Sequence, residues 1–200
     1  MKSNQRGKFI TLYGINNLGK STQAKRLVEE LKAKGIEAEY LKYAIYDLSP
    51  SGPMLNDYLR NGNPYGLTPR EFQIMQVINR TQYQPTLEAT LNQGVWVIAE
   101  DYAPTGVAWG CGAGVDKHFL LRINEHLLRE DLALYFYGVR FSEGIEAVHK
   151  HEQNHELTQK VAEVHEELAD NYGWKKIFAN QAQDEVFENI MKELAPLFES

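Results

Sequence analysis

The sequence predicts an α/β fold in three layers, with a parallel central sheet flanked by helices. Short segments rich in β-branched and aromatic residues alternate along the chain with longer amphipathic segments, and this alternation is typical of βαβ units. The segment 95–99 (VWVIA) is continuously apolar, as expected of a strand buried on both faces. The 200 residues, 43% hydrophobic and 24% charged, fit one globular domain spanning residues 1–200. Ligands of such a sheet bind at the carboxyl ends of its strands.

The first strand and helix are predicted between residues 9 and 34. The strand covers 9–13 (FITLY) and is bounded by glycines on both sides. A helix from about 21 to 34 follows, because its apolar residues recur at the spacing of one helix face. Gly35 stands in the position that commonly ends a helix. The glycine-rich connection between the two elements then lies at a carboxyl strand end.

The following segment predicts a strand, a turn and a short helix. The strand is expected at 37–42, on the alternation of its side chains. The sequence SPSGP at 49–53 predicts a turn, since it combines proline, glycine and serine. A short helix at 55–59 should end at the NGNP sequence, 61–64.

A strong helix start follows at Thr68. Thr68 provides an N-cap, Pro69 suits the first helical position, and Glu71 completes a capping box. This helix should run to about residue 92. The remaining predicted elements are strands at 95–99, 133–137 and 175–178, and helices at about 116–128, 142–149, 157–171 and 184–198.

Composition and charge exclude several classes of protein. The net charge of −6 argues against a surface that neutralises many phosphates of a nucleic acid. No apolar run is long enough to span a membrane, and the N-terminus MKSNQRGKF lacks the apolar region of a secretory signal. The single cysteine, Cys111, forms no internal disulfide. We therefore expect a cytoplasmic protein without nucleic-acid or membrane partners.

The sequence GINNLGKS at 14–21 fits the phosphate-binding pattern G-x-x-x-x-G-K-[ST]. It follows a predicted strand and opens a predicted helix, where backbone N–H groups and the helix N-terminus can wrap an anion. Lys20 would reach the terminal phosphates, and the Ser21 hydroxyl would bind Mg²⁺. A plain strand-to-helix turn is the alternative. The residues predicted to bind ATP are Gly14, Asn16, Asn17, Leu18, Gly19, Lys20, Ser21 and Thr22.

Two acidic residues follow the predicted strand 95–99. Glu100 and Asp101 then lie at the ligand edge of the sheet. Their carboxylates could hold Mg²⁺ through water or accept a proton from a hydroxyl acceptor. We therefore predict Lys20, Glu100 and Asp101 as catalytic residues, with Ser21 and Glu100 as the magnesium ligands. The alternative is that the acidic pair caps the next turn.

A second motif points to different chemistry. Residues 151–155 (HEQNH) match the zinc-protease pattern H-E-x-x-H, in which His151 and His155 would bind the metal. The segment contains no apolar residue that would bury such a site. A solvated connector is therefore the favoured interpretation, with a metal site as its alternative.

Three segments together resemble the thymidylate kinase family. GINNLGKST at 14–22 resembles G-x-D-x-x-G-K-S-T, and Ile78-Asn79-Arg80 resembles A-N-R or A-D-R. EDYAPTGVAW at 100–109 resembles D-R-Y-x-x-S-x-x-A-Y or A-F. Segments at 131–135 and 161–174 are also similar, so the likeness covers most of the chain.

The resemblance implies a P-loop kinase fold with a short lid, which we place at about 149–157. It also implies transfer of the ATP γ-phosphoryl group to the 5′-phosphate of dTMP, with Mg²⁺, by a homodimer. Phe72 would pack on the base, Arg80 would bind its carbonyl edge, and Tyr43 would line the acceptor pocket. Substrate contacts are also assigned to Tyr102, Thr105 and Trp109. Core packing is the alternative for each aromatic residue, and a surface position is the alternative for Arg80.

The chain departs from the family pattern at charged positions. Asn16 stands in place of an aspartate, and Asp101 stands in place of the arginine that contacts the acceptor phosphate. Residues 42–47 (KYAIYD) lack a further family arginine, position 17 is Asn, and no arginine follows Arg140. An arginine in such a site can contribute 10³–10⁵ in rate. The cations left as candidates are Lys20, Lys42, Lys117, Arg122, Arg140 and Lys150.

These departures leave alternative functions open. A deoxynucleoside kinase would keep the ATP site and use Glu100 as the base on the 5′-hydroxyl. A nucleotide-binding protein without catalysis would keep only the fold. The zinc protease is a further alternative, and it depends on the HEQNH segment alone.

Overall fold

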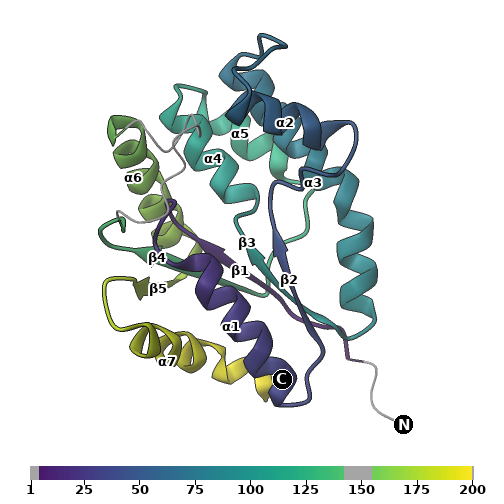
Figure 1. Cartoon of the computed structure of the whole chain (residues 1–200), viewed down its shortest axis with the longest axis vertical. Helices are drawn as coiled ribbons and strands as arrows, with labels where there is room; N and C mark the ends of the chain where they lie inside the picture. Colours follow the sequence, from purple (N-terminus) through teal and green to yellow (C-terminus); the bar gives the residue numbers. More distant parts are fainter. Residues whose placement is uncertain (1–4, 142–154, 200) are drawn as a thin grey trace.

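The computed structural model describes residues 5–141 and 155–199 (Figure 1). Its centre is a five-stranded sheet in the order β2-β3-β1-β4-β5, and every neighbouring pair is parallel. The predicted three-layer α/β fold is confirmed. The strands are β1 (Phe9–Tyr13), β2 (Ala38–Lys42), β3 (Trp96–Glu100), β4 (Leu132–Tyr137) and β5 (Lys175–Phe178).

The central strand β1 is buried on both faces. Ile10 and Leu12 belong to one apolar cluster, whereas Phe9 and Tyr13 belong to a second. This division follows from the alternation of side chains along a strand. It also explains why β1 is continuously apolar in sequence.

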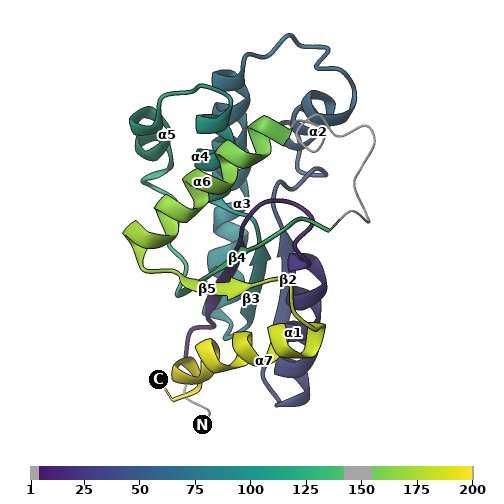
Figure 2. The same ribbon diagram turned by 90° about the vertical axis from the view of Figure 1, so that its left-hand side faces the viewer.

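Helices cover both faces of the sheet (Figure 2). On the face of Ile10, the apolar cluster includes residues of α1 (Lys20–Ala33) and α7 (Gln183–Leu194). On the face of Phe9, it includes residues of α3 (Pro69–Asn92) and α6 (His155–Tyr172). Figure 2 shows α6 and α7 on opposite sides of β5. A short 3₁₀ helix, Ala195–Phe198, ends the described chain after α7.

The connection from β2 to α3 carries a helix that begins earlier than predicted. Helix α2 covers Ser51–Arg60, so the predicted turn at 49–53 is wrong for its last three residues. Proline and glycine are compatible with a turn and equally with the first turn of a helix, where no intrahelical N–H bond is lost. The capping box predicted at Thr68 is confirmed, because Thr68 and Glu71 exchange both hydrogen bonds.

Helix α4 (Ala103–Gly112) was not predicted. Its sequence APTGVAWGCG contains three glycines, which disfavour a helix by about 1 kcal/mol each. The structure shows why small residues occur here. A Cβ on Gly110 would lie 2.7 Å from Leu120 Cδ1, and a Cβ on Gly112 would lie 2.8 Å from Leu157 Cδ1. Close packing against neighbouring helices therefore outweighs the local propensity.

Helix α5 (Lys117–Asn124) is shorter than the predicted helix at 116–128. Asp116 caps it by accepting a hydrogen bond from Phe119 N at 2.8 Å. The predicted helix at 142–149 and most of the predicted lid at 149–157 lie outside the described residues. Residues 155–157 belong to the first turn of α6. In the described part of the chain, no helix is long and apolar enough to cross a membrane.

Candidate active site

The loop between β1 and α1 has the geometry of a phosphate-binding loop. Gly14 has φ 128°, and a Cβ there would lie 2.3 Å from Phe136 O, so only glycine fits at this position. Gly19 has φ 79° and precedes α1 without a side-chain cap. The first-turn N–H groups of α1 therefore have no capping side chain and can bind an anion.

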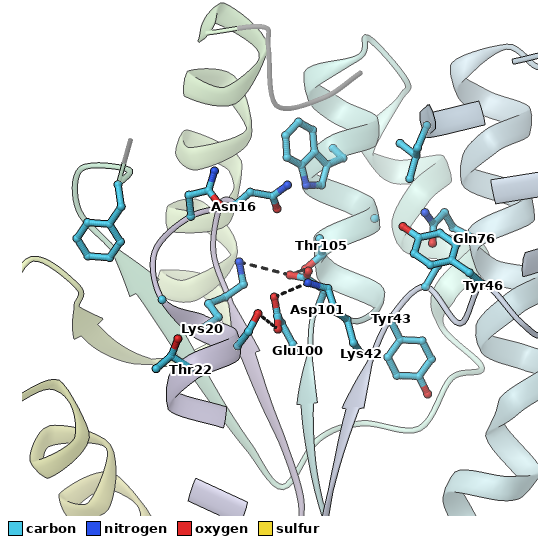
Figure 3. Close-up of a pocket in the computed structure, with 18 of the residues that line it drawn as sticks. Asn16, Lys20, Thr22, Lys42, Tyr43, Tyr46, Gln76, Glu100, Asp101 and Thr105 are labelled. Atoms are coloured by element: carbon cyan, nitrogen blue, oxygen red, sulfur yellow. Dashed lines mark hydrogen bonds and ion pairs between the residues drawn. The ribbon is translucent and has the colours of Figure 1, made fainter. Parts of the chain in front are cut away.

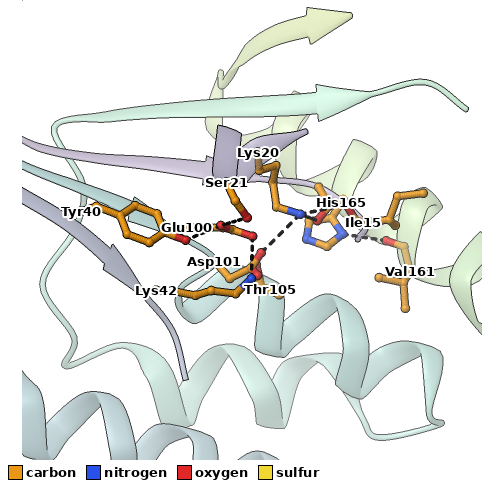
Figure 4. Close-up of polar contacts among 11 residues, drawn as sticks. Ile15, Lys20, Ser21, Tyr40, Lys42, Glu100, Asp101, Thr105, Val161 and His165 are labelled. Carbon is orange, nitrogen blue, oxygen red and sulfur yellow. Dashed lines mark hydrogen bonds and ion pairs between the residues drawn. The ribbon is translucent and has the colours of Figure 1, made fainter. Parts of the chain in front are cut away.

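Lys20 lies in the mouth of this loop (Figure 4). Its ammonium donates hydrogen bonds to Gly14 O and Ile15 O, both at 2.8 Å. Its nitrogen lies 3.8 Å from Asp101 Oδ1. The side chain is 3% exposed. The ammonium contacts polar groups, so the role of Lys20 depends on its positive charge and not on apolar packing in the core.

Glu100, at the end of β3, is surrounded by donors (Figure 4). Its Oε2 accepts hydrogen bonds from Ser21 Oγ at 2.5 Å and Tyr40 Oη at 2.6 Å, and Oε1 lies 3.0 Å from Lys42 Nζ. Burial favours the neutral acid, but Lys20, Lys42 and the two hydroxyl donors outweigh it and lower the pKa of Glu100. Glu100 therefore remains a carboxylate.

Asp101 adopts the left-handed conformation, with φ 61°. Thr105 Oγ1 donates to its Oδ1 at 3.2 Å. Burial raises the pKa of Asp101, and the neighbouring Glu100 charge adds to this effect, against the opposite influence of Lys20. The pKa of Asp101 is thus shifted toward the protonated acid, in the opposite direction to the shift at Glu100.

The oxygen donors fit a magnesium ion. Ser21 contributes a hydroxyl, and Glu100 contributes a carboxylate within 2.5 Å of it. Hard oxygen ligands of this kind suit Mg²⁺, which is usually held by one or two carboxylates together with phosphates and water. The chemistry of these two side chains fits Mg²⁺, and their role as its ligands stays a prediction.

The loop, the acidic pair and several predicted substrate contacts line one cavity of about 930 Å³ (Figure 3). Gly14 and Leu18 do not line it: Gly14 packs against the backbone at Phe136, and Leu18 is buried in the core. Tyr102 lines a second cavity instead and packs against Phe9. The predicted residues that line the main cavity are Asn16, Asn17, Gly19, Lys20, Ser21, Thr22, Tyr43, Phe72, Arg80, Glu100, Asp101, Thr105 and Trp109.

The far end of the cavity is lined by aromatic rings. Phe72 is stacked on Tyr58, with ring centroids 3.9 Å apart. Tyr43 is 5% exposed, and its hydroxyl makes no hydrogen bond with any residue that the structure describes. Such a pocket suits a planar base with a few polar edges.

Arg80 is 3% exposed at this end of the cavity. Its Nε and Nη1 have no hydrogen-bond partner among the described residues. Burial lowers the pKa of the guanidinium, although the neighbouring tyrosines act in the opposite direction. A Cβ on Gly106 would lie 3.0 Å from Arg80 Nη1, so the glycine leaves room beside the charge. Buried donors in proteins are normally hydrogen-bonded, so these nitrogens are suited to donate to an acceptor atom of a bound ligand.

Several cavity residues were missed by sequence reasoning. Tyr46 and Arg60 come from the loop after β2 and from the end of α2, and Gln73 and Gln76 come from α3. The cavity also includes Phe141 and Gln181 to Gln183, at loops that follow β4 and β5. Position at carboxyl strand ends could have indicated Tyr46, Phe141 and Gln181. No local signal indicated Arg60.

Asn79 has a structural role beside Arg80. Its side chain accepts a hydrogen bond from Ile45 N at 2.9 Å and donates to Ile45 O at 2.9 Å. It also donates to Ser51 Oγ. Asn79 therefore fixes the loop after β2 onto α3, which places Tyr43 and Tyr46 along the cavity.

His165 of α6 is buried beside the loop, near Lys20 (Figure 4). Its Nδ1 lies 3.0 Å from Val161 O, and its ring is parallel to that of Tyr135. Burial, and next the Lys20 charge, lower the pKa of His165 to about 3. The imidazole is therefore neutral in the folded protein at physiological pH.

His165 should make the protein sensitive to acid. Its folded pKa lies below the ordinary 6.5, so the unfolded chain binds the proton first and stability falls as the pH drops from 6.5 toward 3. We expect His165→Gln to reduce the stability difference between pH 7.5 and pH 5 by about 2 kcal/mol. Urea unfolding at both pH values measures it, with the exposed His118→Gln as control. An unchanged pH dependence in the variant would contradict this assignment.

The HEQNH motif lies outside the described residues, apart from the backbone of His155 in α6. Among residues 5–141 and 156–199, no group of three or more His, Cys, Asp or Glu side chains could hold a metal ion. The structure thus neither places His151 nor adds a third ligand to the motif.

Comparison with known proteins agrees with this geometry. The family model for thymidylate kinase matches residues 12–190. The thymidylate kinase of Plasmodium falciparum is 26% identical over 96% of this chain and 92% of its own length. That of Dictyostelium discoideum is 27% identical over 98% and 86%. The solved thymidylate kinase of Candida albicans superposes with a TM-score of 0.81, at 21% identity over 96% and 92%. The match of the family model over most of the chain, which includes the phosphate loop, shows that this protein belongs to the thymidylate kinase family.

Proposed function

We propose that this protein transfers the γ-phosphoryl group of ATP to the 5′-phosphate of dTMP, with Mg²⁺, to give dTDP. Membership of the family supports the reaction. The observation that carries it is one cavity with Lys20 and Ser21 at one end and Phe72 and Arg80 at the other. This arrangement suits two nucleotides with their phosphates facing each other between the two ends.

The reaction follows from these positions. An oxygen of the acceptor phosphate attacks the γ-phosphorus, the bond to the β–γ bridging oxygen breaks, and ADP leaves. Lys20 and the N-terminus of α1 stabilise the charge on the transferred group. Mg²⁺, when bound, neutralises charge on the ATP phosphates. Glu100 holds the Ser21 hydroxyl, and Phe72 and Arg80 position the base of the acceptor.

The deoxynucleoside kinase stays a second candidate because of Asp101. This carboxylate lies where the family pattern places an arginine, and burial raises its pKa. A more basic carboxylate could accept the proton of a 5′-hydroxyl. A neutral nucleoside would also avoid repulsion by the acidic pair.

A transfer assay separates the candidates. Purified protein is incubated with ATP and Mg²⁺ and with dTMP, thymidine or the other nucleoside monophosphates in turn. We expect dTDP from dTMP and no product without Mg²⁺. Phosphorylation of thymidine but not of dTMP would establish the nucleoside kinase. Nucleotide binding without transfer to any acceptor would contradict both enzymatic functions.

The proposal includes a cytoplasmic homodimer and the predicted lid at about 149–157. Ile74 and Ile78 support the dimer, because both are 38% exposed one helical turn apart on α3. A second copy of the chain could cover this pair. Light scattering of the purified protein measures the oligomeric state directly.

A further inference from the structure

The acceptor phosphate meets an unusual electrostatic environment in this chain. In the proposed reaction it must lie beside the transferred group, and therefore beside Glu100 and Asp101 at the end of β3 (Figure 3). Lys20 lies 3.8 Å from Asp101 and serves the ATP phosphates. A phosphate dianion placed next to two carboxylates needs further positive charge, because like charges repel strongly in a partly buried site.

The described cations that line the cavity are Lys20, Lys42, Arg60 and Arg80. Arg80 is buried at the base end. The other candidates do not line this cavity: Lys117 pairs with Glu167 at 2.6 Å, Arg122 pairs with Glu125 at 3.4 Å, and Arg140 donates to Thr158 at 3.4 Å. Lys150 lies outside the described residues. Lys42 and Arg60 therefore remain as the described cavity cations that could bind the acceptor phosphate.

Lys42 is placed between the two ends of the cavity. Figure 3 shows it between the acidic pair and Tyr43. One contact joins its ammonium to Glu100 Oε1 at 3.0 Å, and the side chain is 52% exposed. An ammonium carries three N–H donors. Lys42 can therefore keep its ion pair with Glu100 and also donate a hydrogen bond to a phosphate.

Arg60 approaches from a different element. It is the last residue of α2, and its guanidinium lies 4.9 Å from the ring centroid of Tyr46. Tyr46 follows β2 and lines the same cavity. Arg60 Nη1 donates a hydrogen bond to Asn56 Oδ1 at 3.3 Å. Contact with the ring helps to orient the guanidinium, and its five N–H donors allow it to bind an anion as well.

We infer that Lys42, assisted by Arg60, holds the phosphate of the acceptor nucleotide and so makes this site select a monophosphate over a nucleoside. The inference rests on the proposed dTMP kinase function. It assigns acceptor selection to two cations from β2 and α2, and it explains how a phosphate can approach the Glu100 and Asp101 carboxylates.

The test compares protein variants with a ligand that lacks the phosphate. Calorimetry gives the dissociation constants of dTMP and thymidine for each variant. The main variant is Lys42→Gln, which keeps an N–H donor for Glu100 and removes the positive charge. We expect the preference for dTMP over thymidine to fall about tenfold or more, as for the loss of a charge-assisted hydrogen bond. Thymidine affinity and the KM for ATP should stay unchanged, and Lys42→Arg should retain the preference.

Matched controls are available in the chain. Lys175 has the same 52% side-chain exposure and a carboxylate partner, Glu193, but lies outside this cavity, so Lys175→Gln should keep the preference. Arg60→Gln should lower the preference by a smaller factor. Its control is Arg70→Gln, because Arg70 also stacks on an aromatic ring, that of Phe119, and does not line the cavity.

The outcomes separate this inference from the proposed function. If the wild-type protein converts dTMP to dTDP but Lys42→Gln keeps the full preference for dTMP, the inference is wrong and the function stands. A fall in the affinities for dTMP and thymidine by the same factor would also overturn it, since Lys42 would then only support the pocket. If the wild-type protein phosphorylates thymidine and not dTMP, the proposed function itself fails.

Discussion

Lys20→Ala should abolish phosphoryl transfer, with kcat reduced about 10³-fold or more and a raised KM for ATP. Lys20 is the described cation in contact with both the phosphate loop and Asp101. Its loss removes the charge that stabilises the transferred group. The fold should persist, because the hydrogen bonds that Lys20 makes to Gly14 O and Ile15 O are local to the loop.

Steady-state kinetics with ATP and dTMP measures the effect, and thermal unfolding checks the fold. Lys32→Ala is the matched control, because Lys32 belongs to the last turn of the same helix and is exposed. Near wild-type turnover in Lys20→Ala would contradict the assignment of the phosphate loop as the ATP site.

Arg80→Met should weaken the binding of dTMP without destabilising the ligand-free protein. Two nitrogens of the buried guanidinium, Nε and Nη1, have no hydrogen-bond partner among residues 5–141 and 155–199, and a buried charge that is incompletely paired destabilises the ligand-free protein. Its replacement by the unbranched apolar side chain of methionine should leave the melting temperature unchanged or raise it. The affinity for dTMP should fall about tenfold to a hundredfold, because the base loses a charge-assisted hydrogen bond.

Thermal unfolding with and without saturating dTMP measures both effects in one experiment. Addition of dTMP should raise the melting temperature of the wild-type protein. It should raise that of Arg80→Met only slightly. Arg70→Met, an exposed change on the same helix, should behave like the wild type. A variant that is strongly destabilised without ligand yet binds dTMP normally would show that Arg80 supports the fold and not the base.

The elements that sequence reasoning predicted correctly have strong local signals. A few neighbouring residues are enough to predict the apolar strand β1, the amphipathic helix α1 and the capping box at Thr68. Helix α4 could not be predicted, because its glycines are disfavoured locally and are accommodated by Leu120 and Leu157 from other helices. Contacts between distant segments carry no local sequence signal.

The same distinction applies to the site. The phosphate loop and the acidic pair each occupy one contiguous segment. Their residues Lys20, Ser21 and Glu100 could therefore be predicted as site residues from the local sequence. Arg60 reaches the cavity only because α2 packs on α3 and presents its last residue to Tyr46. The placement of Tyr102 also depends on packing: it contacts Phe9 and Tyr43 and lies outside the main cavity.

The order of the strands has a consequence for synthesis of the chain. β1 is made first, yet its two neighbours are β3 and β4, through pairs such as Ile10 with Ile98 and Ile10 with Leu132. On the ribosome the first strand therefore has no partner until β3 has emerged, and it has an open edge until β4 has emerged. Unpaired strand edges promote association with other chains. The phosphate loop, which needs Phe136 O beside Gly14, is completed only when most of the chain has left the ribosome.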